Sequence, residues 1–193
     1  MLRQIILLLV IPLALLHPLA GAQDQLRPYE DADAYDVYSA ILPLEWPLSM
    51  ANAKALVIAA ETSGYNMCIE PEGESKLLIG TAIDDYVRKN VKKLLLQRKF
   101  GDKIPYNIVG SKELTSLFDS RGGWDAFYKK YPDSGGMIGM SAVGFNADKT
   151  IAVVYMGHGC GLLCGGGEFH VLQKKDGKWI PLVWNGKRCG WAS

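Results

Sequence analysis

The hydrophobic pattern of the chain changes at Met137, and this change constrains the fold more than any other feature. Before Met137 apolar residues recur every three or four positions, whereas after it they recur every second position. The first period is typical of amphipathic helices and the second of strands with one buried face. Helices followed by consecutive strands predict an α+β fold with the helices packed on one face of the sheet.

Four helices and two strands are expected before the change. The helix over 81–96 has the clearest signals, because Thr81 can cap its start and Asp84 stands where a capping box places an acid. Pro43 and Pro47 are expected to end the first helix. The predicted helices cover 34–42, 81–96, 112–118 and 124–131, and the predicted strands cover 55–60 and 106–109.

The C-terminal part is expected to form a four-stranded antiparallel meander. The pair Asp176-Gly177 is a strong hairpin signal between the last two strands, and Pro181 favours an edge position or a bulge. No repeat or linker interrupts the sequence, so residues 23–193 are expected to form a single globular domain. The predicted strands cover 137–145, 150–158, 168–174 and 178–184.

Residues 1–22 have the three parts of a secretory signal peptide. Arg3 supplies a positive charge, residues 5–16 are apolar, and Ala20-Gly21-Ala22 is a small-x-small cleavage sequence. The rest of the sequence holds no apolar run of the roughly 20 residues that a membrane helix needs. We therefore expect a secreted or periplasmic protein with no membrane contact after signal cleavage.

The charge balance argues against nucleic acid as a partner. The 193 residues include 21 basic and 20 acidic side chains, which gives a net charge of +1. Cleavage after Ala22 would remove Arg3 and no acid, and would leave 20 residues of each sign. Nucleic-acid binders usually carry a basic excess. The sequence names no other partner.

Residues 157–167 are the segment most suited to chemistry. Six of these eleven residues are glycine, and the segment also holds His158, Cys160 and Cys164, with His170 shortly after it. Glycines permit unusual backbone angles and close approach of other groups. We expect this segment to be the loop between the second and third strands of the meander.

The first interpretation of this segment is structural. Four cysteines in an exported chain predict disulfides, and four cysteines allow three pairings. We favour Cys160–Cys164, because the glycines let the chain fold back over five residues. The pair Cys68–Cys189 then follows by elimination and would fix the C-terminal tail. This interpretation needs no metal and no cofactor.

Two other interpretations use the same residues differently. His158, Cys160, Cys164 and His170 are ligand types that zinc or copper(I) prefers, although the paired C-x2-C spacing of a strong zinc motif is missing. Thiol catalysis is the third interpretation, but C-x3-C in a hairpin lacks the helix N-terminus that lowers a thiol pKa.

The sequence leaves open whether the protein is an enzyme. It holds neither a GxSxG nor an HExxH motif, and Glu168 and His170 share one strand face as a potential acid–base pair. We expect a non-enzymatic binding or structural module stabilised by disulfides. The alternative is a hydrolase or metal-dependent enzyme that uses His158, Glu168 and His170.

Three blocks in the second half of the chain carry a resemblance. They are 123–132 (GWDAFYKKYP), 141–146 (SAVGFN), and 155–167 followed by DGKW at 176–179. Together they resemble a set of uncharacterised secreted bacterial proteins that end in a Cys-Gly-x-Leu-Cys-Gly hairpin and a Gly-Lys-Trp strand. The resemblance spans roughly 31–193. It implies a secreted bacterial location and a regular two-cysteine hairpin, and it implies no activity, cofactor or catalytic residue.

Overall fold

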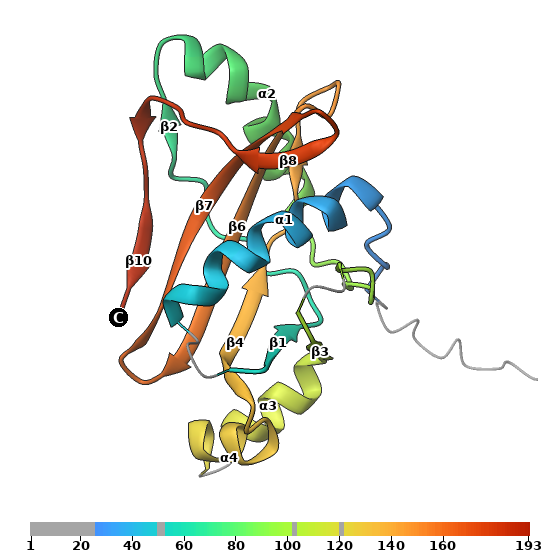
Figure 1. The fold of residues 1–193 in the computed structure, drawn as a ribbon, viewed down its shortest axis with the longest axis vertical. Coiled ribbons are helices and arrows are strands. Elements are labelled where there is room, and N and C mark those ends of the chain that lie inside the picture. Colours follow the sequence, from blue (N-terminus) through green and yellow to red (C-terminus); the bar gives the residue numbers. More distant parts are fainter. Residues whose placement is uncertain (1–25, 50–52, 102–103, 120–121) are drawn as a thin grey trace, which may run out of the picture.

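The computed structural model describes residues 26–49, 53–101, 104–119 and 122–193 (Figure 1). These residues form four helices and ten strands. The helices are α1 (Ala32–Ser49), α2 (Glu74–Lys89), α3 (Ser111–Asp119) and α4 (Gly123–Lys130). The strands are β1 (Ala55–Ala59), β2 (Glu70–Pro71), β3 (Tyr106–Val109), β4 (Ser134–Met140), β5 (Gly144–Phe145), β6 (Ile151–Gly161), β7 (Cys164–Lys175), β8 (Lys178–Pro181), β9 (Gly186–Lys187) and β10 (Gly190–Ala192).

Eight of the strands form one large, mostly antiparallel sheet. Its order is β10-β7-β6-β4-β1-β3, with β5 also paired to β6 and β8 also paired to β7. Only β1 pairs in parallel, with β3 on one side and β4 on the other. The two remaining strands, β2 and β9, form a separate antiparallel pair. The fold therefore mixes α and β structure as expected, but with twice the number of strands predicted for its sheet.

The prediction of one continuous strand over 137–145 is wrong. It is divided into β4 and β5, and both pair with β6. Between them, hydrogen bonds to side chains replace the ladder, because Ala142 N donates to Asn90 Oδ1 (2.8 Å) and Val143 N donates to Tyr29 Oη (3.0 Å). Asn90 and Tyr29 come from distant parts of the chain, so period-two patterning alone could not show the break.

Helices cover both faces of the sheet, so the expectation that they lie on one face is wrong. Alternate residues of β6 point to opposite sides: Val154 belongs to the core that includes α1, and Val153 belongs to the core that includes α2. Figure 1 shows α1 crossing the sheet in front. The central strands are apolar on both faces, which is the pattern of a sheet covered twice.

The helix predicted over 81–96 begins seven residues earlier and ends seven residues earlier. Gly73, with φ of 54°, precedes α2, and Thr81 lies inside the helix rather than at its cap. The helix ends at Lys89, where the Asn90 side chain donates to the Tyr86 carbonyl (2.9 Å). Asn and Gly mark helix ends because their side chain or backbone freedom satisfies the terminal groups.

The first helix also extends beyond its predicted end, since α1 continues through Pro43 and Pro47 to Ser49. A proline inside a helix costs roughly 3 kcal/mol. The apolar face of α1 packs on the sheet, and Val37, Tyr38 and Ile41 are fully buried. At roughly 1.5–3 kcal/mol for each side chain of this kind, burial of these three is comparable with the cost of the two prolines.

The strand at 106–109 is confirmed, and the helices α3 and α4 match the predictions of 112–118 and 124–131 to within one residue at each end. The strand predicted over 55–60 ends one residue earlier. The strands predicted over 150–158 and 168–174 extend to Gly161 and back to Cys164, and the one predicted over 178–184 ends at Pro181. No helix in the described part of the chain has the length and hydropathy that a bilayer crossing requires.

Candidate functional site

The glycine-rich segment is not a loop. It forms the ends of β6 and β7, whose ladder runs through Gly159 opposite Gly165 to Gly161 opposite Cys164. The turn itself contains only Leu162 and Leu163, whose side chains are 92% and 87% exposed. The expectation of a loop here is wrong. Glycine weakens a strand in general, but within a strand it often marks a position where another group approaches the backbone closely.

Aromatic side chains supply that close approach on the α2 side of the sheet. A Cβ added at Gly167 would meet Tyr155 Oη and, at 2.7 Å, Trp191 Nε1. A Cβ added at Gly165 would meet the Trp191 ring at 3.2 Å. The glycines of β7 therefore make room for two rings that lie across the strand.

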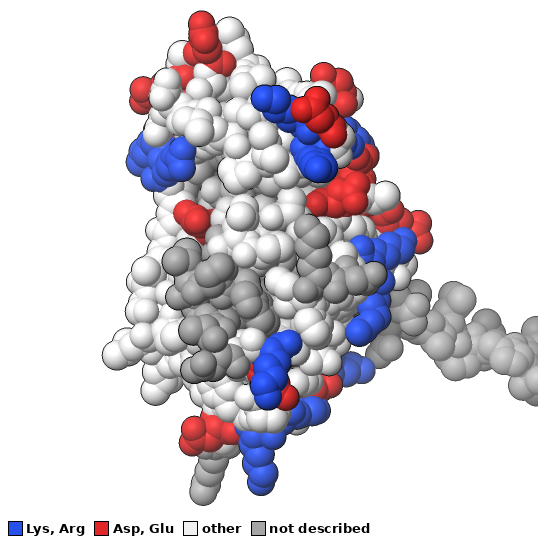
Figure 2. Space-filling view, in the orientation of Figure 1, with Lys and Arg blue, Asp and Glu red and all other residues white. Residues whose placement is uncertain are grey.

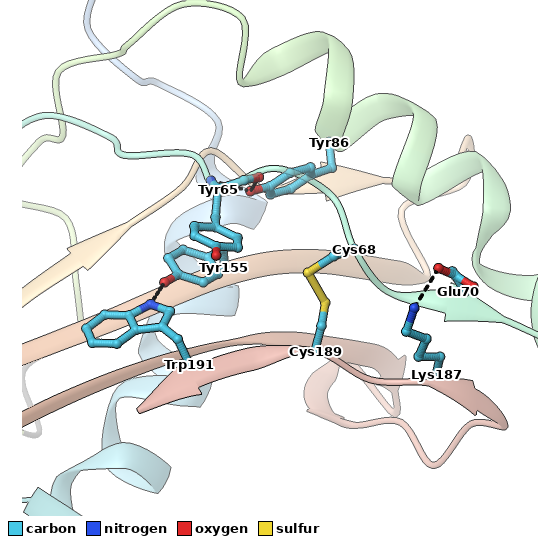
Figure 3. Close-up of a disulfide and its surroundings, with 8 residues drawn as sticks. All are labelled: Tyr65, Cys68, Glu70, Tyr86, Tyr155, Lys187, Cys189 and Trp191. Atoms are coloured by element: carbon cyan, nitrogen blue, oxygen red, sulfur yellow. Dashed lines mark hydrogen bonds and ion pairs between the residues drawn. A yellow bond between two sulfur atoms is a disulfide. The ribbon is translucent and has the colours of Figure 1, made fainter. Parts of the chain in front are cut away.

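These rings belong to a bonded stack that links four parts of the chain (Figure 3). Trp191 Nε1 donates to Tyr155 Oη at 2.5 Å, and the Tyr155 and Tyr65 rings stack with centroids 4.9 Å apart. Tyr65 N in turn donates to Tyr86 Oη at 3.1 Å. Burial raises the pKa of Tyr155 above its ordinary value, and the neutral phenol oxygen accepts a hydrogen bond from the indole N–H.

Two disulfides hold the same end of the molecule. Cys68 is bonded to Cys189, with Cα atoms 5.9 Å apart, and Cys160 is bonded to Cys164, with Cα atoms 5.0 Å apart. Figure 3 shows the first of these beside the aromatic stack. Cys189 directly precedes β10, so this bond and the Trp191 contact together fix β10 against β7.

A groove of about 810 Å³ lies beside β10. Most of its lining side chains belong to the α1 face, because Met156, His158 and Glu168 alternate with residues of the aromatic stack. Its floor is largely glycine backbone, which leaves the groove wide. Glu168 is the one charged side chain among its described lining residues. The lining also includes Cys160, Leu163, Cys164, Gly165, Gly166, Gly167, Gly190, Trp191, Ala192 and Ser193.

A smaller cavity of about 90 Å³ shares one lining residue, Glu168, with this groove. Ile41 and Leu44 of α1 line it together with His170. Glu168 thus lines both the groove that includes His158 and the cavity that includes His170.

The three residues of the enzyme hypothesis share a face but do not converge. His158 lies opposite Gly166, whereas His170 lies opposite Val154. These two positions are four residues apart on β6, which is about 13 Å along a strand. His158 Nε2 lies 3.0 Å from the Gly135 carbonyl oxygen and is committed to that hydrogen bond. The arrangement brings Glu168 near each histidine separately.

The four residues of the metal hypothesis are likewise not assembled into one site. Cys160 and Cys164 are bonded to each other, and His170 lies several residues away along the ladder. Among the described residues, no group of three or more His, Cys, Asp or Glu side chains is placed to hold a metal ion.

Sequence reasoning missed Trp191, which lines the groove, and Tyr155 and Tyr65, whose stacked rings hold it. Trp191 is 41% exposed, whereas Trp184 is buried. Aromatic residues that lie opposite glycines on a neighbouring strand often cover those glycines. This pattern could have identified Trp191 and Tyr155, but only once the register of the strands is known.

Comparisons with known proteins add no relative. A scan against protein-family models, a search of curated proteins and a search of solved structures each found no match to this chain. The functional assignment therefore depends on the fold and on the geometry of the groove.

Proposed function

We propose that this protein is an exported, non-enzymatic binding module that holds a partner or a small ligand in the groove beside β10. The observation that carries the proposal is the groove itself, about 810 Å³ in volume and floored by glycine. Ligand sites are concave, largely preformed and supplied with a few polar groups. Here Glu168 and His158 are those groups.

Rigidity supports binding at this end of the sheet. The Cys68–Cys189 bond and the contact between Trp191 and Tyr155 fix the strand that forms one wall. The Cys160–Cys164 bond closes the hairpin that forms the other. A preformed site avoids the entropic cost of ordering on binding, which favours affinity.

Export is part of the proposal and depends on residues 1–22, which lie outside the described residues. Disulfides persist in oxidising compartments, so the two bonded pairs are compatible with a periplasmic or extracellular location. N-terminal sequencing of the exported protein should find Gln23 first.

A groove-filling variant tests the binding site. Ala192 is exposed and lines the groove, so Ala192→Phe should occupy it without disturbing a core. We would screen amino acids, oligosaccharides and short peptides by thermal shift, because a ligand at a hundred times its Kd stabilises a protein by about 2.7 kcal/mol. Thr115→Phe, on exposed α3, is the matched control. A screen in which no compound stabilises the natural chain more than Ala192→Phe would contradict the proposal.

One observation keeps the enzyme alternative as a second candidate. Glu168 lines both the space near His158 and the cavity near His170, so it could exchange a proton with either imidazole. A hydrolase or metal-dependent enzyme of this kind should lose turnover in Glu168→Gln. Metal analysis of protein purified without chelator separates the metal-dependent form of this alternative from the binding module.

A further inference from the structure

The outer edge of β10 is open for hydrogen bonding. Ser193 N donates to Gly165 O (3.0 Å), so residue 193 faces β7. Residues of an antiparallel strand alternate between bonding inward and outward. The N–H and C=O groups of Ala192 and Gly190 therefore point away from β7, and among the described strands none pairs with β10 on its other side (Figure 1).

The other edges of the sheet are protected, which makes β10 unusual. At the β3 edge, Arg98 Nη2 donates to the Tyr106 carbonyl (3.4 Å), and the guanidinium lies over the Tyr106 ring. The β8 strand carries Lys178 and Pro181. Charged side chains and prolines are the usual devices that prevent strand addition. The three residues of β10 are uncharged and exposed, with no proline among them.

β10 is also held rigidly in the extended form that strand addition needs. Its central residue, Trp191, is bonded to Tyr155, and the Cys68–Cys189 bond fixes its start. The groove lies over β6, β7 and β10, on the face that carries Met156 and Glu168, with Ala192 and Gly190 in its lining. A chain added beside β10 would direct every second side chain to this face of the sheet.

We propose that the occupant of this site is an extended segment of a partner polypeptide, which adds to β10 as a further strand and places a cationic side chain near Glu168. This inference rests on the proposed binding function and names its ligand class. Glu168 is the one Asp, Glu, Lys or Arg side chain among the described groove residues, so a lysine or arginine complements it. The surface at the hairpin tip supplies no competing charge, because residues 157–167 contain none and this part of the molecule is white in Figure 2.

A second copy of this chain fits the edge less well. β10 has three residues, and pairing of two such strands alone would bury far less than the roughly 1,200 Å² of a stable specific interface. A peptide does not need that area, because main-chain hydrogen bonds provide affinity and the groove provides contacts for its side chains.

The test uses a random heptapeptide phage library selected on the full mature chain with both disulfides intact. Enriched peptides are synthesised and their affinities measured by fluorescence anisotropy. Ala192→Pro removes the outward N–H without touching a bond to β7, and it should weaken binding about tenfold, the equivalent of one lost hydrogen bond. Ala192→Ser keeps the N–H and should stay within about twofold. Glu168→Gln should weaken binding of the lysine- or arginine-containing peptides about fivefold.

A scan of N-methylated peptides gives the signature of strand addition. Methylation of every second amide should reduce affinity, and methylation of the intervening amides should not. Affinity that is equal across the scan, or unchanged in Ala192→Pro, would overturn the inference. So would a library that yields no specific peptide.

Two outcomes distinguish failure of strand addition to β10 from failure of ligand binding in the groove. If peptides or small compounds no longer bind Ala192→Phe but bind Ala192→Pro normally, the groove is a binding site and strand addition to β10 is excluded. A concentration-dependent dimer in light scattering that disappears in Ala192→Pro would mean that a second copy occupies the edge, and would overturn the choice of partner.

Discussion

At the scale of single residues, Gly167 is the position in the site that leaves least room for a side chain. A methyl group there would collide with Tyr155 Oη and Trp191 Nε1, and the stack with Tyr65 prevents the Tyr155 ring from moving aside. We expect Gly167→Ala to lower the free energy of unfolding by about 1–3 kcal/mol, as overpacking does. Urea unfolding measures this. Gly161→Ala is the control, because its Cβ would meet only ordinary contact at 3.4 Å; an equal loss in both variants would contradict the explanation.

Asp33 is the residue that links stability to pH. The Lys174 and Lys149 ammonium groups bond its carboxylate at 2.8 and 3.1 Å and lower its pKa. A lowered folded-state pKa means that the stabilisation is present above the unfolded value of about 3.9 and is lost as pH falls through the folded value. Asp33→Asn should therefore cost about 1 kcal/mol at pH 7 and flatten the decline in unfolding free energy below about pH 4. Asp36→Asn, exposed on the same helix, is the control, and an identical acid profile in the two variants would refute the assignment.

At the scale of elements, the two disulfides should contribute very differently to stability. Cys68 and Cys189 are 121 residues apart, whereas Cys160 and Cys164 are four apart. The chain-entropy model gives about 5 kcal/mol for the long closure and about 2 kcal/mol for the short one. Thermal unfolding of the two paired-alanine variants should show the larger loss for Cys68→Ala/Cys189→Ala. Equal losses would mean that native-state contacts, rather than loop closure, set their contributions.

The elements also show what the sequence could predict and what it could not. Local signals were sufficient for α3 and α4, whose apolar spacing is complete within nine residues. They failed for α2, because Thr81 and Asp84, which resemble a capping box, lie inside the helix, and the neighbouring Asp85 bonds Phe145 N and Lys89. Local sequence patterns could not predict the open edge of β10. It depends on which strand is outermost, and β10 pairs with a segment 22 to 26 residues earlier in the chain.

At the scale of the whole molecule, β6 connects the two faces of the sheet. Val153 and Val154 are both fully buried but belong to different cores, one with α2 and one with α1. Each core also has its own tryptophan, Trp184 on the α2 side and Trp179 on the α1 side. Because both cores pack on the same strand, displacement of β6 would disrupt the packing of both cores together.

We therefore expect one cooperative unfolding transition, as for a single domain. Val153→Ala and Val154→Ala should each lower the free energy of unfolding by about 2 kcal/mol through the cavity they leave. In both variants, tryptophan fluorescence and far-UV circular dichroism should report the same urea midpoint. Two separated midpoints, with each variant shifting only one of them, would show instead that the α1 and α2 sides unfold independently. In that case β10, which is anchored through Tyr155 and Cys68 to the α2 side, would lose its fixed edge whenever that side opened.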